Sequence, residues 1–193
     1  MMCDSVGTRS KRMAVAAAAA FMLMASAAYA SRSAVQDRTV TLDQAQAMAK
    51  TASEGSSIPL AVNELVLKRL NRFVGTPEGR KYVREGLDRM AHFRPMIEEK
   101  LSQAGYPKEL LAIPLFESGY HNGRKSTHSA AGIWQFIPQT ARRYGMTVSE
   151  RLDDRLDPAK ETDAAISYYG DMLKLFKNDW LLTLKAYNEG ESR

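Results

Sequence analysis

The 193-residue sequence predicts an all-α protein built from short helices. Apolar residues recur at the spacing that lines one face of a helix. One such stripe consists of Val62, Val66, Leu70 and Phe73. The pairs Thr76-Pro77 and Asp157-Pro158 each combine a helix cap with a proline suited to a first helical turn. No segment alternates apolar and polar residues over a strand length between two turn signals, so the pattern favours helices throughout.

The first thirty residues have the organisation of a cleavable signal peptide. Arg9, Lys11 and Arg12 form a positively charged start. The apolar run of residues 13–26 that follows is shorter than the about 20 residues that span a bilayer. Ala28-Tyr29-Ala30 then supplies the small-x-small pattern of a cleavage site. We therefore expect an exported, periplasmic protein cleaved after this motif; an uncleaved membrane anchor is the alternative.

The charge and the cysteine content narrow the possible partners. The full chain carries 27 basic and 22 acidic residues, and removal of residues 1–30 leaves 24 against 21. A weak positive charge suits an anionic polymer or a membrane face. The sequence has no basic cluster with interleaved aromatic residues, which argues against nucleic acid. The single cysteine, Cys3, lies within the predicted signal peptide, so the exported chain has no thiol for a disulfide.

The first half of the exported chain is expected to hold a linker and a helical extension. Residues 31–58 are rich in small and polar residues and predict a linker with at most one short helix, over residues 42–51. Residues 59–104 predict the helical extension, in which Gly75 ends one helix and Pro95 marks a kink or a new helix start.

The second half, residues 105–193, predicts a succession of short helices. Pro107 opens a helix that runs to Glu117, with a kink expected at Pro114. A polar loop follows at residues 119–130, and an apolar turn or short helix at residues 131–136. Three more helices are expected over residues 138–144, 159–176 and 180–187.

Glu117 is the candidate acid that the residues themselves suggest. It ends an apolar helix and precedes the polar loop, so its carboxyl group loses hydration and its pKa should rise. A raised pKa is what a general acid near neutral pH needs. A solvated glutamate at a helix end is the alternative, and the residues alone leave both interpretations open.

Three segments resemble the ordered motifs of the family 1 lytic transglycosylases, which contain the SLT domain. They are Glu117-Ser118-Gly119-Tyr120, residues 131–138 (Ala-Gly-Ile-Trp-Gln-Phe-Ile-Pro), and Ala186-Tyr187-Asn188-Glu189-Gly190. Trp134-Gln135-Phe136 is most similar to the membrane-bound type D branch of the family. The resemblance covers residues 105–193 and extends weakly back to Pro59, and three motifs in order are a specific signal.

This resemblance implies a lysozyme-like SLT domain with Glu117 as its catalytic residue. Gln135 would bind the sugar near the cleaved bond, and Tyr187 would hold the reactive geometry. Ser118 and Asn188 would shape the substrate site, with helix capping and packing as the alternative. Tyr120 is assigned to the groove, and Phe136 to packing. Because such domains usually continue with further helices, residues 105–193 are expected to be a C-terminally short SLT domain.

The resemblance also implies the reaction and the partners. The substrate would be peptidoglycan glycan strands, cleaved at the MurNAc-GlcNAc β-1,4 bond with formation of 1,6-anhydroMurNAc and without a metal or cofactor. The three histidines lack metal-ligand spacing. We expect a monomer, with peripheral membrane association. The alternatives are a goose-lysozyme-type hydrolase that recruits a later acid such as Asp157, and a non-catalytic peptidoglycan-binding module.

Overall fold

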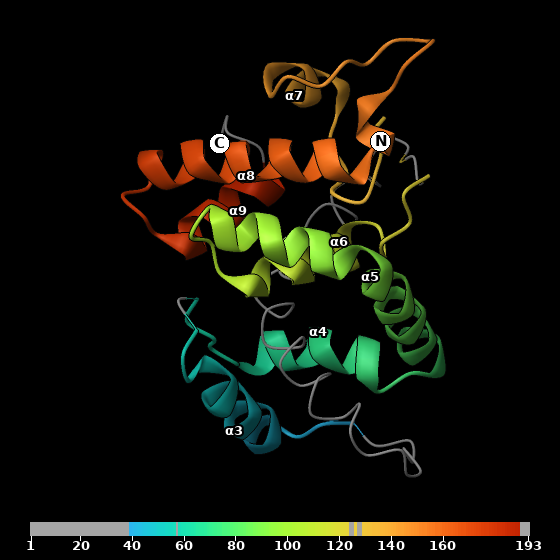
Figure 1. The fold of residues 1–193 in the computed structure, drawn as a ribbon. Coiled ribbons are helices and arrows are strands. Elements are labelled where there is room, and N and C mark those ends of the chain that lie inside the picture. Colours follow the sequence, from blue (N-terminus) through green and yellow to red (C-terminus); the bar gives the residue numbers. More distant parts are fainter. Residues whose placement is uncertain (1–38, 57, 124–125, 127–128, 190–193) are drawn as a thin grey trace, which may run out of the picture. The chain divides into compact units, whose positions relative to one another are not determined.

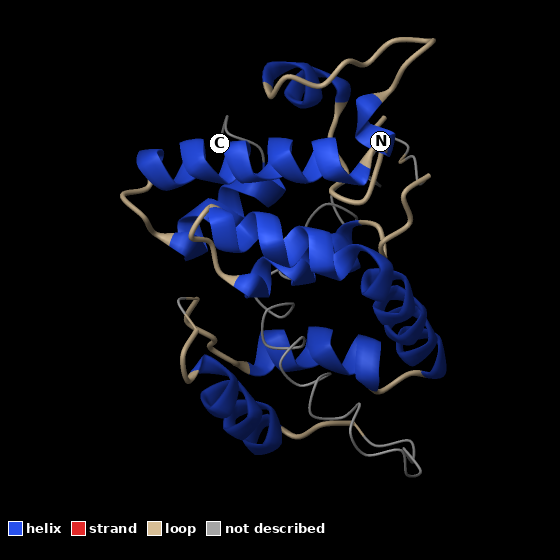
Figure 2. Cartoon of the chain, in the orientation of Figure 1, coloured by secondary structure: helices blue, strands red, loops and turns tan. Residues whose placement is uncertain are grey.

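The computed structural model describes residues 39–56, 58–123, 126 and 129–189, and this part of the chain is all-α, as predicted. Figure 2 shows helices joined by loops, with no strand among the described residues. Two isolated antiparallel bridges occur, between Ala131 and Phe136 and between Val148 and Asp153. None of the described helices combines the length and the apolar character that crossing a membrane requires. The predicted signal peptide and its cleavage site lie outside the described residues.

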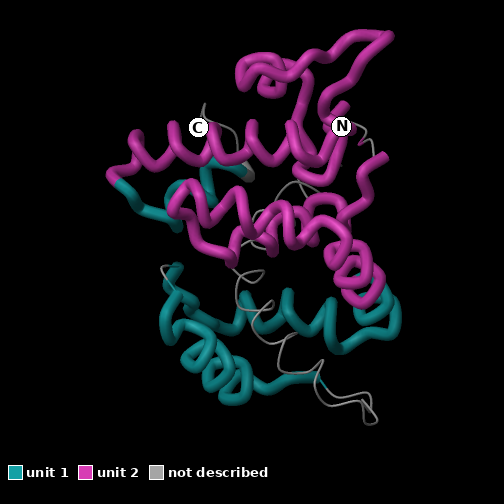
Figure 3. The backbone as a smooth tube through the Cα atoms, viewed as in Figure 1, with its two compact units in different colours: residues 1–82, 178–193 teal, residues 83–177 magenta. Residues whose placement is uncertain are grey.

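The chain divides into two compact units, shown in teal and magenta in Figure 3. Unit 1 comprises residues 1–82 and 178–193, and unit 2 comprises residues 83–177. The helices wholly within unit 1 are α3 (Leu42–Ser53), α4 (Glu64–Val74) and α9 (Trp180–Glu189). The elements wholly within unit 2 are η1 (Lys108–Leu111), α6 (Ala112–Glu117), α7 (Pro138–Arg143), η2 (Asp154–Leu156) and α8 (Pro158–Leu175). Helix α5 (Pro77–Gln103), labelled in Figure 1, begins in unit 1 and continues into unit 2.

In unit 1, α3 packs on α4, and amide side chains join their ends. Asn71 of α4 accepts a hydrogen bond from the Val40 backbone nitrogen at 2.8 Å and donates one to the Val40 carbonyl at 2.9 Å. Gln46 of α3 donates to the Val62 carbonyl at 3.1 Å. The face that α3 buries carries only alanines, Ala45, Ala49 and Ala52. The short helix predicted within the linker is confirmed, and the predicted domain boundaries themselves stay predictions.

Helix α5 is a single helix of 27 residues with Pro95 inside it, so the predicted alternative of a new helix start at Pro95 is wrong, and the alternative of a kink stays a prediction. It begins at Pro77, whose missing N–H costs nothing in a first turn. It ends at Gln103, and Gly105, two residues later, has a φ of +70°, which suits a glycine. The nitrogens of Gly105 and Tyr106 donate back to the carbonyls of Ser102 and Leu101, at 3.0 and 2.9 Å. This pattern is a Schellman cap, which satisfies carbonyls that the helix end leaves open.

The helix predicted from Pro107 to Glu117 is two elements, the 3₁₀ turn η1 and the α-helix α6. The break falls between Leu111 and Ala112, and not at Pro114 as predicted. Pro114 lies in the first turn of α6, where no backbone N–H is needed for the helix. It therefore neither kinks nor ends the helix.

The remaining helices begin where their caps predicted. The Asp157 carboxylate accepts hydrogen bonds from the nitrogens of Ala159 and Lys160 at 3.0 and 3.2 Å and caps α8. Asp179 accepts from the nitrogens of Leu181 and Leu182 at 2.8 and 3.0 Å in the first turn of α9. Residues 131–136 form a turn and not a helix.

The largest fully buried side chains of unit 2 include Ile97, Leu101, Leu110, Leu115, Tyr120, Ile133, Trp134 and Tyr169.

Candidate active site

Glu117 is the last residue of α6, and its side chain is half-buried. The preceding residues of the helix, Ala112 to Leu115, are buried, so the helix is fixed in the core of unit 2 up to two residues before the glutamate. One group that Glu117 influences is the phenol of Tyr169 on α8. Burial raises the pKa of Tyr169 well above its usual value, and the negative charge of Glu117 raises it further. The two side chains therefore interact electrostatically.

Ser118 follows Glu117 and is completely buried. Its hydroxyl oxygen lies 2.9 Å from the Ile133 carbonyl oxygen and 3.1 Å from the Pro114 carbonyl oxygen, so it can donate its proton to either. The bond to Ile133 joins the end of α6 to the 131–136 turn, the segment of residues 131–136. A substrate-binding role for Ser118 stays a prediction, since the structure places its hydroxyl on the backbone.

The 131–136 turn carries Gln135. It contains two residues with a positive φ, a backbone conformation that residues other than glycine rarely adopt. Its ends are joined by a hydrogen bond from the Ala131 nitrogen to the Phe136 carbonyl at 3.0 Å. Gly132 has a φ of +85° and Gln135 a φ of +57°. The Gln135 amide nitrogen donates to the Gly132 carbonyl at 2.8 Å, and this bond holds the side chain against its own turn. A Cβ at Gly132 would overlap the Arg155 carbonyl oxygen and the carboxylate of Glu161, so the position requires glycine.

Glu161 of α8 binds backbone N–H groups of the 131–136 turn. It is fully buried and accepts hydrogen bonds from the nitrogens of Ile133 and Trp134 at 2.7 and 2.9 Å. Burial raises the pKa of Glu161, while backbone hydrogen bonds from Trp134, Ile133 and Phe136 and the charge of Arg155 oppose the rise. Glu161 does not stand out in the sequence, because a glutamate in a first helical turn is an ordinary helix-start feature.

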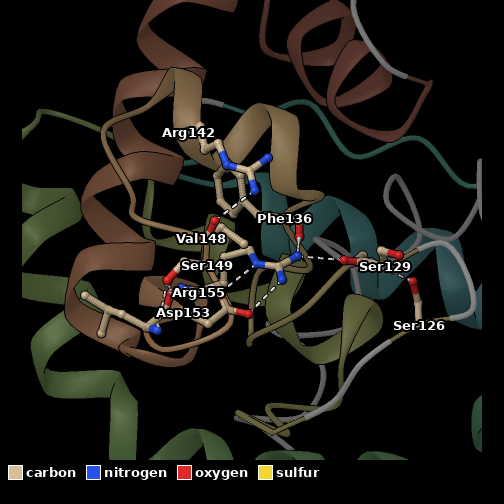
Figure 4. A network of polar contacts seen from close by, with 10 residues as sticks. Ser126, Ser129, Phe136, Arg142, Val148, Ser149, Asp153 and Arg155 are labelled. Carbon is tan, nitrogen blue, oxygen red and sulfur yellow. Dashed lines mark hydrogen bonds and ion pairs between the residues drawn. The ribbon is translucent and has the colours of Figure 1, made fainter.

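Arg155 binds backbone carbonyl groups in and just before the same turn, as Figure 4 shows. Its side chain is buried, and one guanidinium nitrogen donates to the carbonyls of Ser129 and Phe136 at 2.6 and 3.0 Å. The other two guanidinium nitrogens bind both carboxylate oxygens of Asp153, at 2.8 and 2.7 Å. This bidentate pair fixes the plane of the guanidinium group. No motif in the sequence marked Arg155 or Asp153.

The aromatic residues near the turn lie in the core. Trp134 is fully buried, its indole nitrogen donates to the Thr162 hydroxyl at 3.1 Å, and its ring meets Tyr169 edge-on. Phe136 is buried, as predicted. Tyr120 is only 1% exposed, so it lies in the interior and not in a groove. Its hydroxyl donates to the Leu111 carbonyl at 2.7 Å, which satisfies the polar end of a buried tyrosine.

Glu117, Ser118 and Gln135 thus all lie in unit 2, where the Ser118 hydroxyl links the end of α6 to the turn that carries Gln135. Tyr187 and Asn188 lie in α9, which belongs to unit 1, and their placement beside Glu117 stays a prediction. Asp157, the alternative acid, has its carboxylate engaged as the cap of α8. Among the described residues, no three His, Cys, Asp or Glu side chains are grouped as metal ligands would be.

Comparison with known proteins finds several that are similar to part of this chain. Membrane-bound lytic murein transglycosylase D of Escherichia coli K12 is 40% identical over 97 residues, which are 50% of this chain and 22% of that protein. A putative tributyltin chloride resistance protein of Alteromonas is 32% identical over 97 residues, 50% of this chain and 47% of that protein. The peptidoglycan transglycosylase gp16 of phage T7 is 35% identical over 78 residues, 40% and 6% of the two chains. The matched segment is therefore less than half of each of these relatives.

The first and the third of these relatives are named as transglycosylases. The chain belongs to the transglycosylase SLT domain family, whose model matches residues 94–193, just over half of the sequence. The family resemblance and the all-α, lysozyme-like fold class expected from the sequence are thereby confirmed.

Proposed function

We propose that this protein is a lytic transglycosylase that cleaves the MurNAc-GlcNAc β-1,4 bond of peptidoglycan and releases a 1,6-anhydroMurNAc end. The observation that carries the proposal is the position of Glu117. It ends a buried helix, and the next residue, Ser118, is hydrogen-bonded to the turn that presents Gln135. This link between the end of α6 and the turn supports the proposal, because catalysis at one bond requires that the acid and the groups that bind the sugar keep a fixed geometry.

One carboxyl group is enough for this reaction, because the substrate supplies the nucleophile. The acetamido carbonyl oxygen of MurNAc attacks its own anomeric carbon, while Glu117 gives its proton to the departing GlcNAc oxygen. Glu117, now a carboxylate, then takes the proton of the MurNAc C6 hydroxyl group. The C6 oxygen attacks the anomeric carbon and displaces the acetamido oxygen, which closes the anhydro ring without consuming water.

The other site residues support this chemistry by binding and by positioning. Gln135 would hydrogen-bond the sugar next to the cleaved bond, and Tyr187 would hold the acetamido group or Glu117. Asn188 would shape the site from the same helix, α9. Ser118 and Tyr120 act from the interior, since both direct their hydroxyl groups to backbone carbonyls. No metal or cofactor takes part in the proposed reaction.

The proposed location is the periplasm, reached through the signal peptide of residues 1–30, where peptidoglycan is accessible. The positive start, apolar run and Ala28-Tyr29-Ala30 motif support export. The E. coli relative is named as membrane-bound, which supports a peripheral membrane association for this chain as well. We propose that the exported protein acts as a monomer.

Mass analysis of the soluble products from purified peptidoglycan sacculi tests the proposal. The unmutated protein should release anhydro-muropeptides, each lighter by one water than the corresponding hydrolysis product. Glu117→Gln keeps the shape of the side chain but has no proton of suitable acidity to donate, so turnover should fall by about 10²–10⁴-fold. Asp157→Ala is the control, because removal of this cap should cost stability and leave the product unchanged.

Two outcomes would overturn the assignment. Reducing-end muropeptides as the main product would indicate the goose-lysozyme-type hydrolase, and Asp157→Ala should then abolish turnover. Binding to sacculi without any released product, under conditions in which the protein is folded, would indicate a non-catalytic peptidoglycan-binding module.

A further inference from the structure

The core of unit 2 contains the carboxyl group of Glu161. The side chain is completely enclosed, and its two oxygens meet the nitrogens of Ile133 and Trp134. A buried carboxylate loses the hydration that stabilises its charge, so such a group persists in a fold only where hydrogen bonds replace the water. Both oxygens of Glu161 are used in this way, and both partners belong to the 131–136 turn.

The turn is shaped to receive this carboxylate. Two successive N–H groups, of Ile133 and Trp134, point to one anionic group, which is the arrangement by which backbone nests bind anions. Gly132 precedes them with a positive φ, and a Cβ there would overlap Glu161 itself. The conformation of the turn and the presence of Glu161 therefore depend on each other.

Arg155 completes the enclosure with the opposite charge. It donates to the carbonyl of Phe136, at the end of the turn, and to that of Ser129, two residues before the turn, and it is itself oriented by Asp153. The N–H groups of Ile133 and Trp134 thus face an anion, and the carbonyls on either side of them face a cation. Displacement of the turn in either direction would break charge-assisted hydrogen bonds, which are about twice as strong as neutral ones.

Ile133 transmits this constraint to the proposed acid. Its nitrogen donates to Glu161, and its carbonyl accepts the hydroxyl of Ser118, the residue next to Glu117. Gln135 lies two residues further along the same turn. A shift of the turn would therefore move Gln135 and the support of Glu117 together.

We propose that Glu161, assisted by Arg155, is a positioning residue of the reaction, which sets the 131–136 turn and thereby the geometry between Glu117 and Gln135. The inference rests on the proposed function of Glu117. Glu161 acts through Ile133 and Ser118 and does not touch the substrate.

Glu161→Gln tests this role directly. The amide keeps the volume but turns a donor toward one of the two N–H groups, so the turn must shift to relieve the conflict. We expect kcat to fall by about 10²-fold, the effect of a small misplacement of reacting groups, with a smaller change in KM. The amide resonances of Ile133 and Trp134 should move in the nitrogen–proton NMR spectrum, and their hydrogen exchange should accelerate. An unchanged kcat in the folded variant would overturn the proposal.

Asp154→Asn is the matched control. Asp154 is also buried and accepts a backbone hydrogen bond, from the Thr147 nitrogen at 2.8 Å, but it anchors a different loop. Its loss should lower stability while kcat of the folded protein stays normal. If both variants lost kcat equally, a general loosening of unit 2 would explain the result, and the positioning role would be wrong.

A double-mutant cycle separates positioning from simple loss of stability. Ser118→Ala removes the hydroxyl through which Ile133 supports the residue next to Glu117. If Glu161 acts by this route, the double variant Glu161→Gln/Ser118→Ala should lose clearly less kcat than the product of the two single losses. Independent, multiplicative losses would contradict the route.

Two further outcomes keep the test decisive. If Glu161→Gln does not fold, Arg155→Lys replaces the fork with a single ammonium group and should give the same kcat loss with KM little changed. An Arg155→Lys variant that folds and keeps normal kcat would then contradict the proposal. If the unmutated protein releases no anhydro product, the proposed function has failed, whereas normal turnover of the unmutated protein and of Glu161→Gln means that only the positioning role has failed.

Discussion

The α3–α4 pair of unit 1 and the 131–136 turn of unit 2 are both held by side chains that bind backbone groups, but the side chains differ in charge and burial. In unit 1 the binding groups are the neutral amides of Asn71 and Gln46, which are partly exposed. In unit 2 they are the ionisable groups of Glu161 and Arg155, which are almost completely buried. Neutral amides at the surface can exchange their partners for water at little cost. Buried ionisable groups have no such substitute, so a turn that they hold has one permitted position.

The strongest test of this difference is Arg155→Met. The change leaves Asp153, which is 14% exposed, without its bidentate partner and removes the donors to two backbone carbonyls. Breaking a buried ion pair from one side typically costs about 3–5 kcal/mol of unfolding free energy. Chemical denaturation followed by circular dichroism measures this loss.

Arg94→Met is the matched control for that experiment. Arg94 pairs with Glu98 across one turn of α5, with 52% and 34% of the two side chains exposed. Exposed pairs of this kind contribute about 0.3–0.5 kcal/mol. Equal losses in Arg155→Met and Arg94→Met would mean that the enclosure of the turn contributes no more than a surface contact.

The pH dependence of stability should also follow the ionisable groups of unit 2. Burial raises the pKa of Glu161 above the usual value of about 4.3. Between the usual pKa of the unfolded chain and the raised pKa of the folded protein, the folded protein keeps a proton on Glu161 that the unfolded chain has released. The contribution of this protonation to stability is therefore fully present below the usual value and is lost as the pH rises through this window. Denaturation midpoints measured at closely spaced pH values should show this slope, and Glu161→Gln should remove it.

Asp154 gives the opposite sign and so provides an internal check. Its hydrogen bond with Lys160 and that from the Thr147 nitrogen lower the pKa of the carboxyl group. The stabilisation is present above the usual pKa of an aspartate, about 3.9, and is lost as the pH falls through the lowered value. Asp154→Asn should flatten the acid limb and leave the Glu161 window unchanged. If Asp154→Asn, and not Glu161→Gln, removed the pH dependence of stability above the usual glutamate pKa, the assignment of that dependence to Glu161 would be wrong.

The difference between local and long-range contacts explains which parts of the structure the sequence predicted. Helix starts at Pro77, Pro158 and Trp180 follow from caps that act on the next three residues, so the sequence around them is sufficient. The break at Leu111 was missed because Pro114 is equally suited to a kink and to a first turn.

Long-range contacts explain what remained hidden at the site. Glu161 binds nitrogens 27 and 28 residues away, and Arg155 reaches carbonyls 19 and 26 residues away. Tyr120 was assigned to a groove, but its hydroxyl finds the Leu111 carbonyl in the interior. The motif resemblance singled out Glu117 and Gln135 as candidates. The residues that bind the 131–136 turn, Glu161 and Arg155, could be recognised only from the fold.

A smaller effect is expected from Asn71→Ala in unit 1. The change removes two hydrogen bonds to Val40, each worth about 0.5–1.5 kcal/mol net where the freed groups can reach water. The thermal midpoint should fall by a few degrees, on the scale of about 2–4 °C per kcal/mol for a chain of this size. Product formation from sacculi should be normal at temperatures where the variant is folded. A loss as large as that of Arg155→Met would remove the distinction between the two regions.

The smallest effect concerns the start of α3. The Thr41 hydroxyl accepts a hydrogen bond from the Gln44 nitrogen, and the Gln44 side chain accepts one from the Thr41 nitrogen, which together form a capping box. Both contacts are exposed, so Thr41→Ala should cost about 0.5–1 kcal/mol and act locally. The Gln44 amide should exchange its hydrogen faster, while the Ile133 and Trp134 amides keep their rates. Thr41→Ser restores the hydroxyl and should return the Gln44 rate to normal. Faster exchange at Ile133 in Thr41→Ala would mean that the end of α3 and the 131–136 turn open together, and the two regions would then not be independently stabilised.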